Sequence, residues 1–213
     1  MGTLDATIAR LGQARASAIV RTHDHDLAQR ALEAAVAGGF RSLEITLTTP
    51  GALELIGHFA REPELLVGAG TVLDVEQARA VVDAGGQFLV SPVADAPVAK
   101  VARELDVPLI AGANTPTELL AAHRMGAPLQ KLFPVPAGGP TWLKAVLGPL
   151  PFLRVVPTNG VDADNAHAWF EAGAFGVGFA AVLFTPELMA ARDVAGIMKR
   201  ARHLVAAVAA QPG

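Results

Sequence analysis

The sequence has no cysteine and contains few charged residues. Without cysteine, disulfide bonds and thiolate chemistry are excluded, and redox conditions do not restrict the compartment. Charged residues make up 17% of the 213 positions and give a formal net charge of −3, with no long run of either sign. We therefore expect neither a nucleic acid nor an anionic membrane surface as an electrostatic partner.

Long apolar runs are also missing. No stretch reaches the roughly 18 uninterrupted apolar residues that predict a membrane span. The first residues, "MGTLDATIARLGQARAS", lack the apolar centre of a secretory signal peptide. Hydrophobic residues nevertheless account for 52% of the chain, which is typical of a globular protein with a large core. We expect a cytoplasmic enzyme, with residues 1–213 forming one domain and residues 1–16 a helix at its start.

Eight short apolar segments recur about every 20 residues. Amphipathic stretches separate them, such as residues 26–37, where apolar side chains recur with helical spacing. We interpret the apolar segments as strands: "SAIVR" (17–21), "SLEITL" (42–47), "LLVGAG" (65–70), "QFLVSP" (87–92), "PLIAG" (108–112), "LQKLF" (129–133), "LRVVPT" (153–158) and "FGVGF" (175–179).

Glycines mark a faint internal repeat. Gly38, Gly85, Gly126 and Gly173 each stand where a helix is expected to end and a strand to follow, and glycine suits a left-handed turn there. Eight strand–helix units repeated in this way predict a single (β/α)₈ TIM barrel, an α/β fold. An open doubly wound sheet is the alternative.

Glu44 and Lys131 are an unusual pair of charged residues, because both lie inside otherwise apolar strands. In a TIM barrel, polar residues at the carboxyl ends of strands are functional candidates. A buried ion pair without a function is the structural alternative, although such pairs stabilise a fold weakly because both charges lose water. The chain has four lysines, and Lys131 alone has a mainly apolar strand around it.

The lysine–carboxylate pair suggests a specific chemistry. A neutral lysine amine attacks a ketone, and apolar walls or a nearby cation such as Arg21 favour the neutral form. The resulting imine withdraws electrons, so that a neighbouring carbon–carbon bond can break without a metal. Proton transfer in these steps requires an acid–base group, and Glu44 is the carboxylate available at the predicted strand ends.

The chain resembles the 2-keto-3-deoxy-6-phosphogluconate / 2-keto-4-hydroxyglutarate aldolase family, which is class I and acts through a Schiff base. The matching segments are "LEITL" (43–47), "VGAGTVL" (67–73), "AGGQFLVSP" (84–92), "KLFPV" (131–135) and "VVPTNGV" (155–161). The resemblance implies a TIM barrel, commonly a homotrimer, without a cofactor or metal. It also implies cleavage of a 2-keto-3-deoxy sugar acid, expected to be 6-phosphorylated, or of 4-hydroxy-2-oxoglutarate, to pyruvate and an aldehyde.

The resemblance also implies residue roles. Lys131 matches the Schiff-base lysine and Glu44 the acid–base residue, while Thr71 matches the threonine that holds the pyruvate carboxylate. The remaining substrate-binding positions that we carry over are Arg21, Pro92 and Phe133 around the keto acid, and Thr158, Asn159, Gly160, Ala180 and Ala181 in the two loops expected at a phosphate.

Three departures from the family pattern affect substrate recognition. Thr48 stands where many members have an arginine that contacts the substrate carboxylate, so that role is expected to pass to Arg21. The loop after the seventh strand reads Thr158-Asn159-Gly160 where members usually have Thr-Gly-Gly. The loop after the last strand lacks the usual serine and contains the bulky Phe179. Backbone N–H groups can hold a phosphate without side chains, so a phosphorylated and a non-phosphorylated substrate both remain open.

Other interpretations follow from the same residues. His23, Asp24 and His25 suggest a metal site, but successive loop residues point apart and zinc ligands must converge, so a solvated loop is favoured. A barrel enzyme acting on a sugar phosphate without an imine remains an alternative. A barrel that binds a keto acid, or assembles with a partner, without turnover is another.

Overall fold

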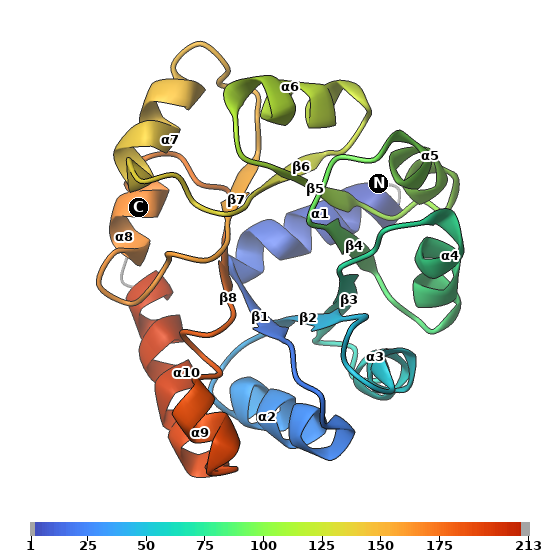
Figure 1. Cartoon of the computed structure of the whole chain (residues 1–213), viewed down its shortest axis with the longest axis vertical. Helices are drawn as coiled ribbons and strands as arrows, with labels where there is room; N and C mark the ends of the chain where they lie inside the picture. Colours follow the sequence, from blue (N-terminus) through green and yellow to red (C-terminus); the bar gives the residue numbers. More distant parts are fainter. Residues whose placement is uncertain (1–2, 210–213) are drawn as a thin grey trace.

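In the computed structural model, which describes residues 3–209, a ring of parallel strands is surrounded by helices (Figure 1). The eight strands are β1 (Ala16–Val20), β2 (Ser42–Thr46), β3 (Leu66–Gly70), β4 (Phe88–Ser91), β5 (Leu109–Ala113), β6 (Leu129–Leu132), β7 (Val155–Pro157) and β8 (Val177–Phe179). The helices are α1 (Thr3–Ala14), α2 (His25–Ala37), α3 (Ala52–Phe59), α4 (Val75–Asp83), α5 (Ala96–Glu104), α6 (Pro116–Arg124), α7 (Gly139–Leu147), α8 (Ala166–Glu171), α9 (Pro186–Ala190) and α10 (Val194–Ala209).

The strands follow one another around the ring in the order β7-β6-β5-β4-β3-β2-β1-β8. Thr158, directly after β7, forms an isolated parallel bridge with Gly178 of β8, and this bridge closes the sheet on itself. The prediction of a single (β/α)₈ TIM barrel is therefore confirmed, and all eight predicted strand segments contain a strand. The open doubly wound sheet is excluded, because that sheet would have two free edges.

Short polar side chains fix where many of the helices begin. In each case the carboxylate or hydroxyl of the residue before the helix accepts a hydrogen bond from the backbone N–H three positions later. The donors and acceptors are Leu27 to Asp24, Gln77 to Asp74, Val98 to Asp95, Glu118 to Thr115 and Leu188 to Thr185.

The glycine repeat holds at three of its four positions. Gly85, Gly126 and Gly173 have positive φ values and end their helices as predicted. At the first position the prediction was wrong by one residue, because Gly39 takes the left-handed conformation and Gly38 does not. Gly38 serves packing, since a Cβ atom there would lie 2.3 Å from the Cβ of Ala201 on α10.

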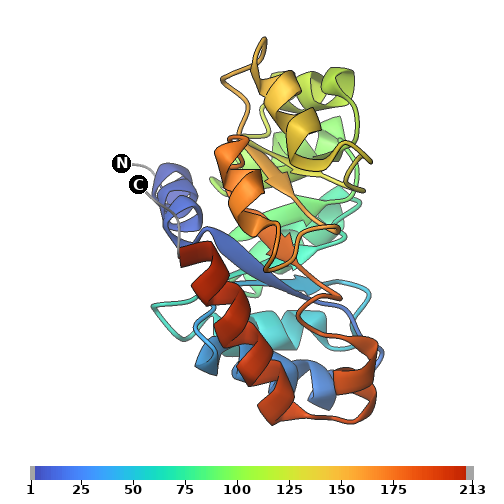
Figure 2. The ribbon, with the colours of Figure 1, turned by 90° about the vertical axis from the view of Figure 1, so that its left-hand side faces the viewer.

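Of the helix predicted over residues 1–16, the structure shows α1 over Thr3–Ala14, while residues 1–2 lie outside the described residues and Ala16 already belongs to β1. Helix α1 covers one end of the barrel (Figure 2). It is buried through Ile8 and Leu11, which pack on residues that begin or line the strands: Leu66, Phe88, Val90, Ile110 and Leu129. Several of these are the first residues of their strands, so α1 seals the amino-terminal end. The carboxyl-terminal end stays open. Within residues 3–209, none of the helices is long and apolar enough to cross a membrane.

Candidate active site

Glu44 and Lys131 meet across the inside of the barrel. The two residues are on β2 and β6, which are four strands apart and hence on opposite sides of an eight-stranded ring. The Lys131 Nζ donates to Glu44 Oε1 at 3.1 Å. Lys131 is 8% exposed and Glu44 4%, so the lysine does not escape to solvent.

A glycine on the neighbouring strand β3 makes this meeting possible. A Cβ atom at Gly70, the last residue of β3, would lie 2.2 Å from Glu44 Oε1, closer than any real contact. Gly112 on β5, the register partner of Lys131, instead makes room for the loop after β4, because a Cβ atom there would lie 2.0 Å from the Pro92 carbonyl oxygen. The interior at this level therefore has room for one long lysine and one glutamate, which reach each other where bulky aliphatic side chains would otherwise stand.

Gly70→Ala is expected to displace the Glu44 carboxylate and to lower turnover by at least about 10²-fold, the lower range for a general acid–base group. The added methyl also overpacks the interior, at about 1–3 kcal/mol of unfolding free energy. Steady-state turnover and thermal unfolding measure the two effects. Gly148→Ala is the matched control, because its added Cβ would have no neighbour nearer than 3.4 Å. Turnover at the wild-type rate in Gly70→Ala would show that Glu44 does not depend on this gap.

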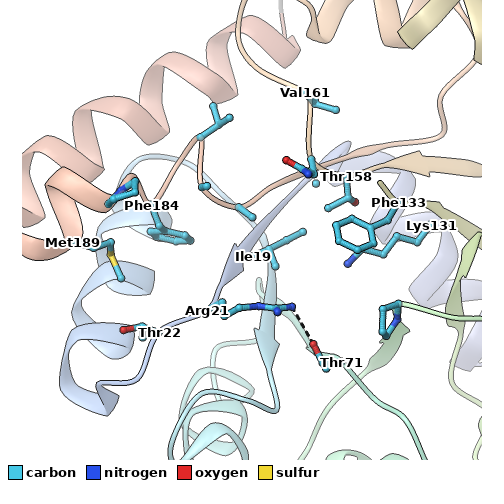
Figure 3. A pocket seen from close by; sticks show the side chains of 17 residues that line it. Ile19, Arg21, Thr22, Thr71, Lys131, Phe133, Thr158, Val161, Phe184 and Met189 are labelled. Carbon is cyan, nitrogen blue, oxygen red and sulfur yellow. Dashed lines mark hydrogen bonds between the residues drawn. The ribbon is translucent and has the colours of Figure 1, made fainter. Parts of the chain in front are cut away.

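The lysine faces a cavity of about 440 Å³ at the carboxyl ends of the strands (Figure 3). This size lies within the range of ligand sites. Most of the predicted site residues line it: Arg21, Thr71, Pro92, Lys131, Phe133, Thr158, Asn159, Ala180 and Ala181. Glu44 lies next to the cavity through its bond to Lys131, whereas Gly160 is not a lining residue.

Arg21 and Thr71 form a second polar centre beside the lysine. Arg21 Nη2 donates to Thr71 Oγ1 at 3.2 Å, and Figure 3 shows the guanidinium reaching from the end of β1 toward Thr71. Thr71 has φ +62, a left-handed conformation that a β-branched residue rarely adopts. Such strain is typical of functional sites, since the surrounding structure must hold it. A guanidinium and a hydroxyl placed in this way suit a carboxylate.

The residue that replaces the family arginine has a structural role. The Thr48 hydroxyl lies 3.0 Å from that of Thr46, which also contacts Thr49 at 3.2 Å. Thr48 is not among the residues that line the cavity, and Arg21 is. The expectation that Phe179 lies in the loop was wrong. It ends β8, and its buried ring packs edge-on against Phe40 at 6.1 Å, outside the cavity wall.

The segment that suggested a metal site anchors the loop after β1. Asp24 caps α2 and pairs with Arg192, and His25 Nδ1 lies 3.2 Å from the carbonyl oxygen of Pro50. Within residues 3–209, no three histidine, aspartate or glutamate side chains converge as metal ligands.

The pKa of the Asp24 carboxyl lies below its ordinary value, because the Leu27 N–H donates to it and Arg192 is close by. A lowered pKa means that Asp24 stabilises the fold above its ordinary pKa and loses this effect as the pH falls through the folded value. The difference in melting temperature between wild type and Asp24→Asn is therefore expected to stay constant while the pH is above 3.8, the ordinary pKa of this carboxyl, and to shrink as the pH falls below it. A difference that stays constant below this pH would contradict the assignment.

Sequence reasoning missed the far side of the cavity. Ile19, Thr22, Val161, Gly178, Val182, Phe184, Pro186 and Met189 also line it. Most of them are apolar and follow β7 or β8, so they look like ordinary core residues in the sequence. Their position after the last two strands is the signal that could have found them.

A closed barrel with a buried lysine–carboxylate pair facing a cavity at its carboxyl end has the architecture of TIM-barrel enzymes. The model of the "KDPG and KHG aldolase" family matches residues 7–200. The chain belongs to the KDPG and KHG aldolase family.

Two curated relatives have similar sequences. The KHG/KDPG aldolase of Escherichia coli (strain K12) is 44% identical over 135 residues, which cover 62% of this chain and 63% of that protein. The 2-dehydro-3-deoxy-phosphogluconate aldolase of Pseudomonas aeruginosa is 42% identical over 135 residues, 62% of this chain and 61% of that protein. The matched segment thus spans less than two thirds of either relative.

Solved structures match over a longer range. The KDPG aldolase of Legionella pneumophila, with pyruvate captured as a covalent carbinolamine intermediate, has a TM-score of 0.81 and 28% identity, covering 93% of this chain and 97% of that one. The native KDPGal structure has a TM-score of 0.82 and 31% identity, covering 90% and 93%.

Proposed function

We propose that this chain is a class I aldolase that cleaves a 4-hydroxy-2-oxo acid to pyruvate and an aldehyde through a Schiff base on Lys131. The observation that carries the proposal is the buried contact of 3.1 Å between Lys131 Nζ and Glu44 Oε1, beside a cavity large enough for the substrate. The pyruvate-bound relative from Legionella pneumophila supports the same chemistry.

Lys131 begins the reaction by attacking the C2 ketone. The carbonyl becomes a carbinolamine and then loses water, leaving a protonated imine between the substrate and Nζ. The positive imine next to C3 is the electron sink of the cleavage step.

Glu44 is proposed to move the protons. In cleavage it accepts the proton of the C4 hydroxyl, the C3–C4 bond breaks, and its electrons pass through C3 to the imine nitrogen. An aldehyde and an enamine result. Protonation of the enamine at C3 regenerates the imine, and water releases pyruvate and the free lysine.

Arg21 and Thr71 are proposed to hold the C1 carboxylate of the keto acid. Their hydrogen-bonded pairing lies in the same cavity as Lys131, and Pro92 and Phe133 supply apolar contacts there. The Phe133 ring centroid is 5.8 Å from Lys131 Nζ. Thr158, Asn159, Ala180 and Ala181 are then left to surround the aldehyde half, with Gly160 shaping the turn behind them.

Borohydride trapping tests this function. Incubation with pyruvate and then borohydride is expected to add one reduced pyruvyl group to the peptide that contains Lys131. Lys100, Lys144 and Lys199 lie on helices and serve as internal controls that should remain unmodified. No adduct would overturn the proposal: pyruvate binding without turnover would then favour a binding protein, and turnover of a sugar phosphate would favour an imine-independent barrel enzyme.

The homotrimer and the cytoplasmic location stay predictions from the sequence. Light scattering of the purified protein measures its molecular mass in solution and hence the number of subunits. A mass of one subunit would contradict the homotrimer.

A further inference from the structure

A second cavity lies at the amino-terminal end of the barrel, opposite the one that contains Lys131. It has a volume of about 670 Å³, and its wall is formed by the end of α1, by α8 and by the segments that lead into β7 and β8. The two cavities share no described lining residue. The second cavity is therefore a separate feature of the molecule, and the aldolase chemistry does not use it.

Two arginines give the second cavity a positive charge. Arg15 immediately precedes β1 and Arg154 immediately precedes β7, so the closed ring brings two cations together from distant parts of the chain. Within residues 3–209, neither guanidinium forms an ion pair with a carboxylate. Among the described lining residues, Glu171 alone carries a carboxylate, and it pairs with His167 on the same helix at 3.2 Å. The charges of the two arginines are therefore left for a ligand.

Aromatic rings cover the faces of both guanidinium groups. Arg15 Cζ lies 4.2 Å from the centroid of the Phe170 ring, and Arg154 Cζ lies 5.9 Å from that of Phe175. Both rings also line the second cavity. A ring on the face of a guanidinium attracts the cation but leaves the N–H groups on its edge free to donate in the plane. Donors arranged in this way suit the oxygens of a carboxylate or a phosphate.

Arg15 combines backbone strain with an unsatisfied donor. Its φ is +58, in the left-handed region that residues other than glycine rarely adopt. Its Nε atom is buried and has no acceptor among the described residues. Strain of this kind is typical of functional sites, and a buried donor without a partner costs free energy. An anion in the cavity would bring acceptor oxygens to this residue.

The backbone holds both arginines in place. The Arg15 carbonyl oxygen accepts from the Val177 N–H of β8 at 2.8 Å. The Arg154 N–H donates to Oε1 of the buried Gln130 on β6 at 3.0 Å. Both cations therefore start from fixed points of the barrel, which lowers the entropy that a ligand loses when it orders them.

We propose that the second cavity binds a small phosphorylated anion, whose phosphate oxygens accept hydrogen bonds from Arg15 and Arg154. A phosphate monoester carries close to two negative charges at neutral pH and has three terminal oxygens, so it matches two guanidinium groups. A single carboxylate carries one charge and matches them less well. Phe170, Phe175 and the buried Leu153 offer apolar contacts to the organic part of the ligand.

Site-resolved protection of arginines tests the proposal. Phenylglyoxal modifies guanidinium groups, and peptide mass spectrometry gives the modification rate at each arginine of the intact protein. Pyrophosphate is the probe. At ten times its dissociation constant it is expected to slow modification of Arg154 about tenfold, because only about one site in eleven stays free. Arg61 and Arg124 are exposed, line neither cavity and should react at an unchanged rate.

Three results of this assay would overturn the proposal. The first is an unchanged rate at Arg154. The second is equal protection of Arg61 and Arg124, which would show general screening by the anion. The third is equal protection by acetate or succinate at the same ionic strength, which would show that the site does not select phosphate.

Two substitutions are expected to shift the pyrophosphate concentration that half-protects Arg154 in opposite directions. Arg15→Gln should raise it by at least about tenfold, the effect of losing one hydrogen bond to a charged group. Glu171→Gln should lower it, because the variant removes the carboxylate from the wall, and this exposed side chain is not needed for folding. Arg124→Gln is the matched control, since it changes the net charge as Arg15→Gln does but lies outside the cavity. Equal half-protection in all three variants would contradict the placement.

The aldolase function and the second cavity fail independently. Borohydride trapping on Lys131 reports the aldolase function alone. Arg21 lines the cavity of Lys131 and Arg154 lines the second cavity, so one digest separates a phosphate bound at the active site from one bound at the opposite end of the barrel. Protection of Arg21 without protection of Arg154 would leave the aldolase function intact and overturn the second site.

Discussion

Replacing Lys131 by methionine is expected to lower kcat/KM for aldol cleavage by about 10⁴- to 10⁶-fold, the range seen when a covalent nucleophile is removed. In free energy this is about 5–8 kcal/mol of lost transition-state stabilisation. Methionine has a similar length but no amine, so neither the carbinolamine nor the imine can form. Steady-state kinetics and the borohydride assay measure both losses.

The loss must be separated from a loss of folding. Methionine at position 131 leaves the buried Glu44 without its cation, and breaking a buried pair in this way destabilises a fold by about 3–5 kcal/mol. Lys131→Arg is the first control, because it keeps a cation near Glu44 but cannot form an imine. The double variant Lys131→Met/Glu44→Gln is the second, and it should recover part of the stability without any activity. Turnover near the wild-type rate in Lys131→Arg would disprove the Schiff-base role.

Glu44→Gln is expected to slow cleavage by about 10²- to 10⁴-fold while the imine with pyruvate still forms. The amide oxygen can accept the hydrogen bond from Lys131, so the lysine stays in place. The amide cannot take or return a proton, so the C–C bond-breaking step and the protonation at C3 are both slowed. The expected signature is a borohydride adduct of normal yield together with a low kcat.

Glu44→Asp is the companion variant. It keeps the carboxylate but withdraws it by one methylene, so we expect a smaller loss of kcat than in Glu44→Gln. Proton exchange at the pyruvate methyl group, followed by NMR in deuterated water, reports the acid–base step without any aldehyde. Wild-type exchange in Glu44→Gln would assign that step to another group.

The strand pattern made the barrel predictable. Each apolar segment is short, and the stretches between have helical spacing, so strand and helix periods alternate along the chain. Exact element ends were less predictable, as the shift from Gly38 to Gly39 shows. Gly38 is held close to Ala201, a residue far away in the sequence, and no local pattern distinguishes it from the adjacent glycine that takes positive φ.

Part of the site was also predictable. Burying a charged residue in an apolar strand costs free energy, so such a residue is conspicuous in a sequence. The sequence alone therefore pointed to Lys131 and Glu44. The apolar wall formed by Phe184 and Met189 gave no comparable signal, because an apolar side chain that lines a cavity cannot be distinguished by type from one that fills a core.

The sequence by itself determined the alternation of strands and helices and the two charges that have no place in an ordinary core. Only the tertiary structure decided that these charges meet, because β2 and β6 come to face each other when the ring closes and because Gly70 leaves room between them. Closure of the ring likewise brought Ile19 of β1 and apolar residues that follow β7 and β8 together as one wall of the cavity, and no local pattern in the sequence encodes this wall.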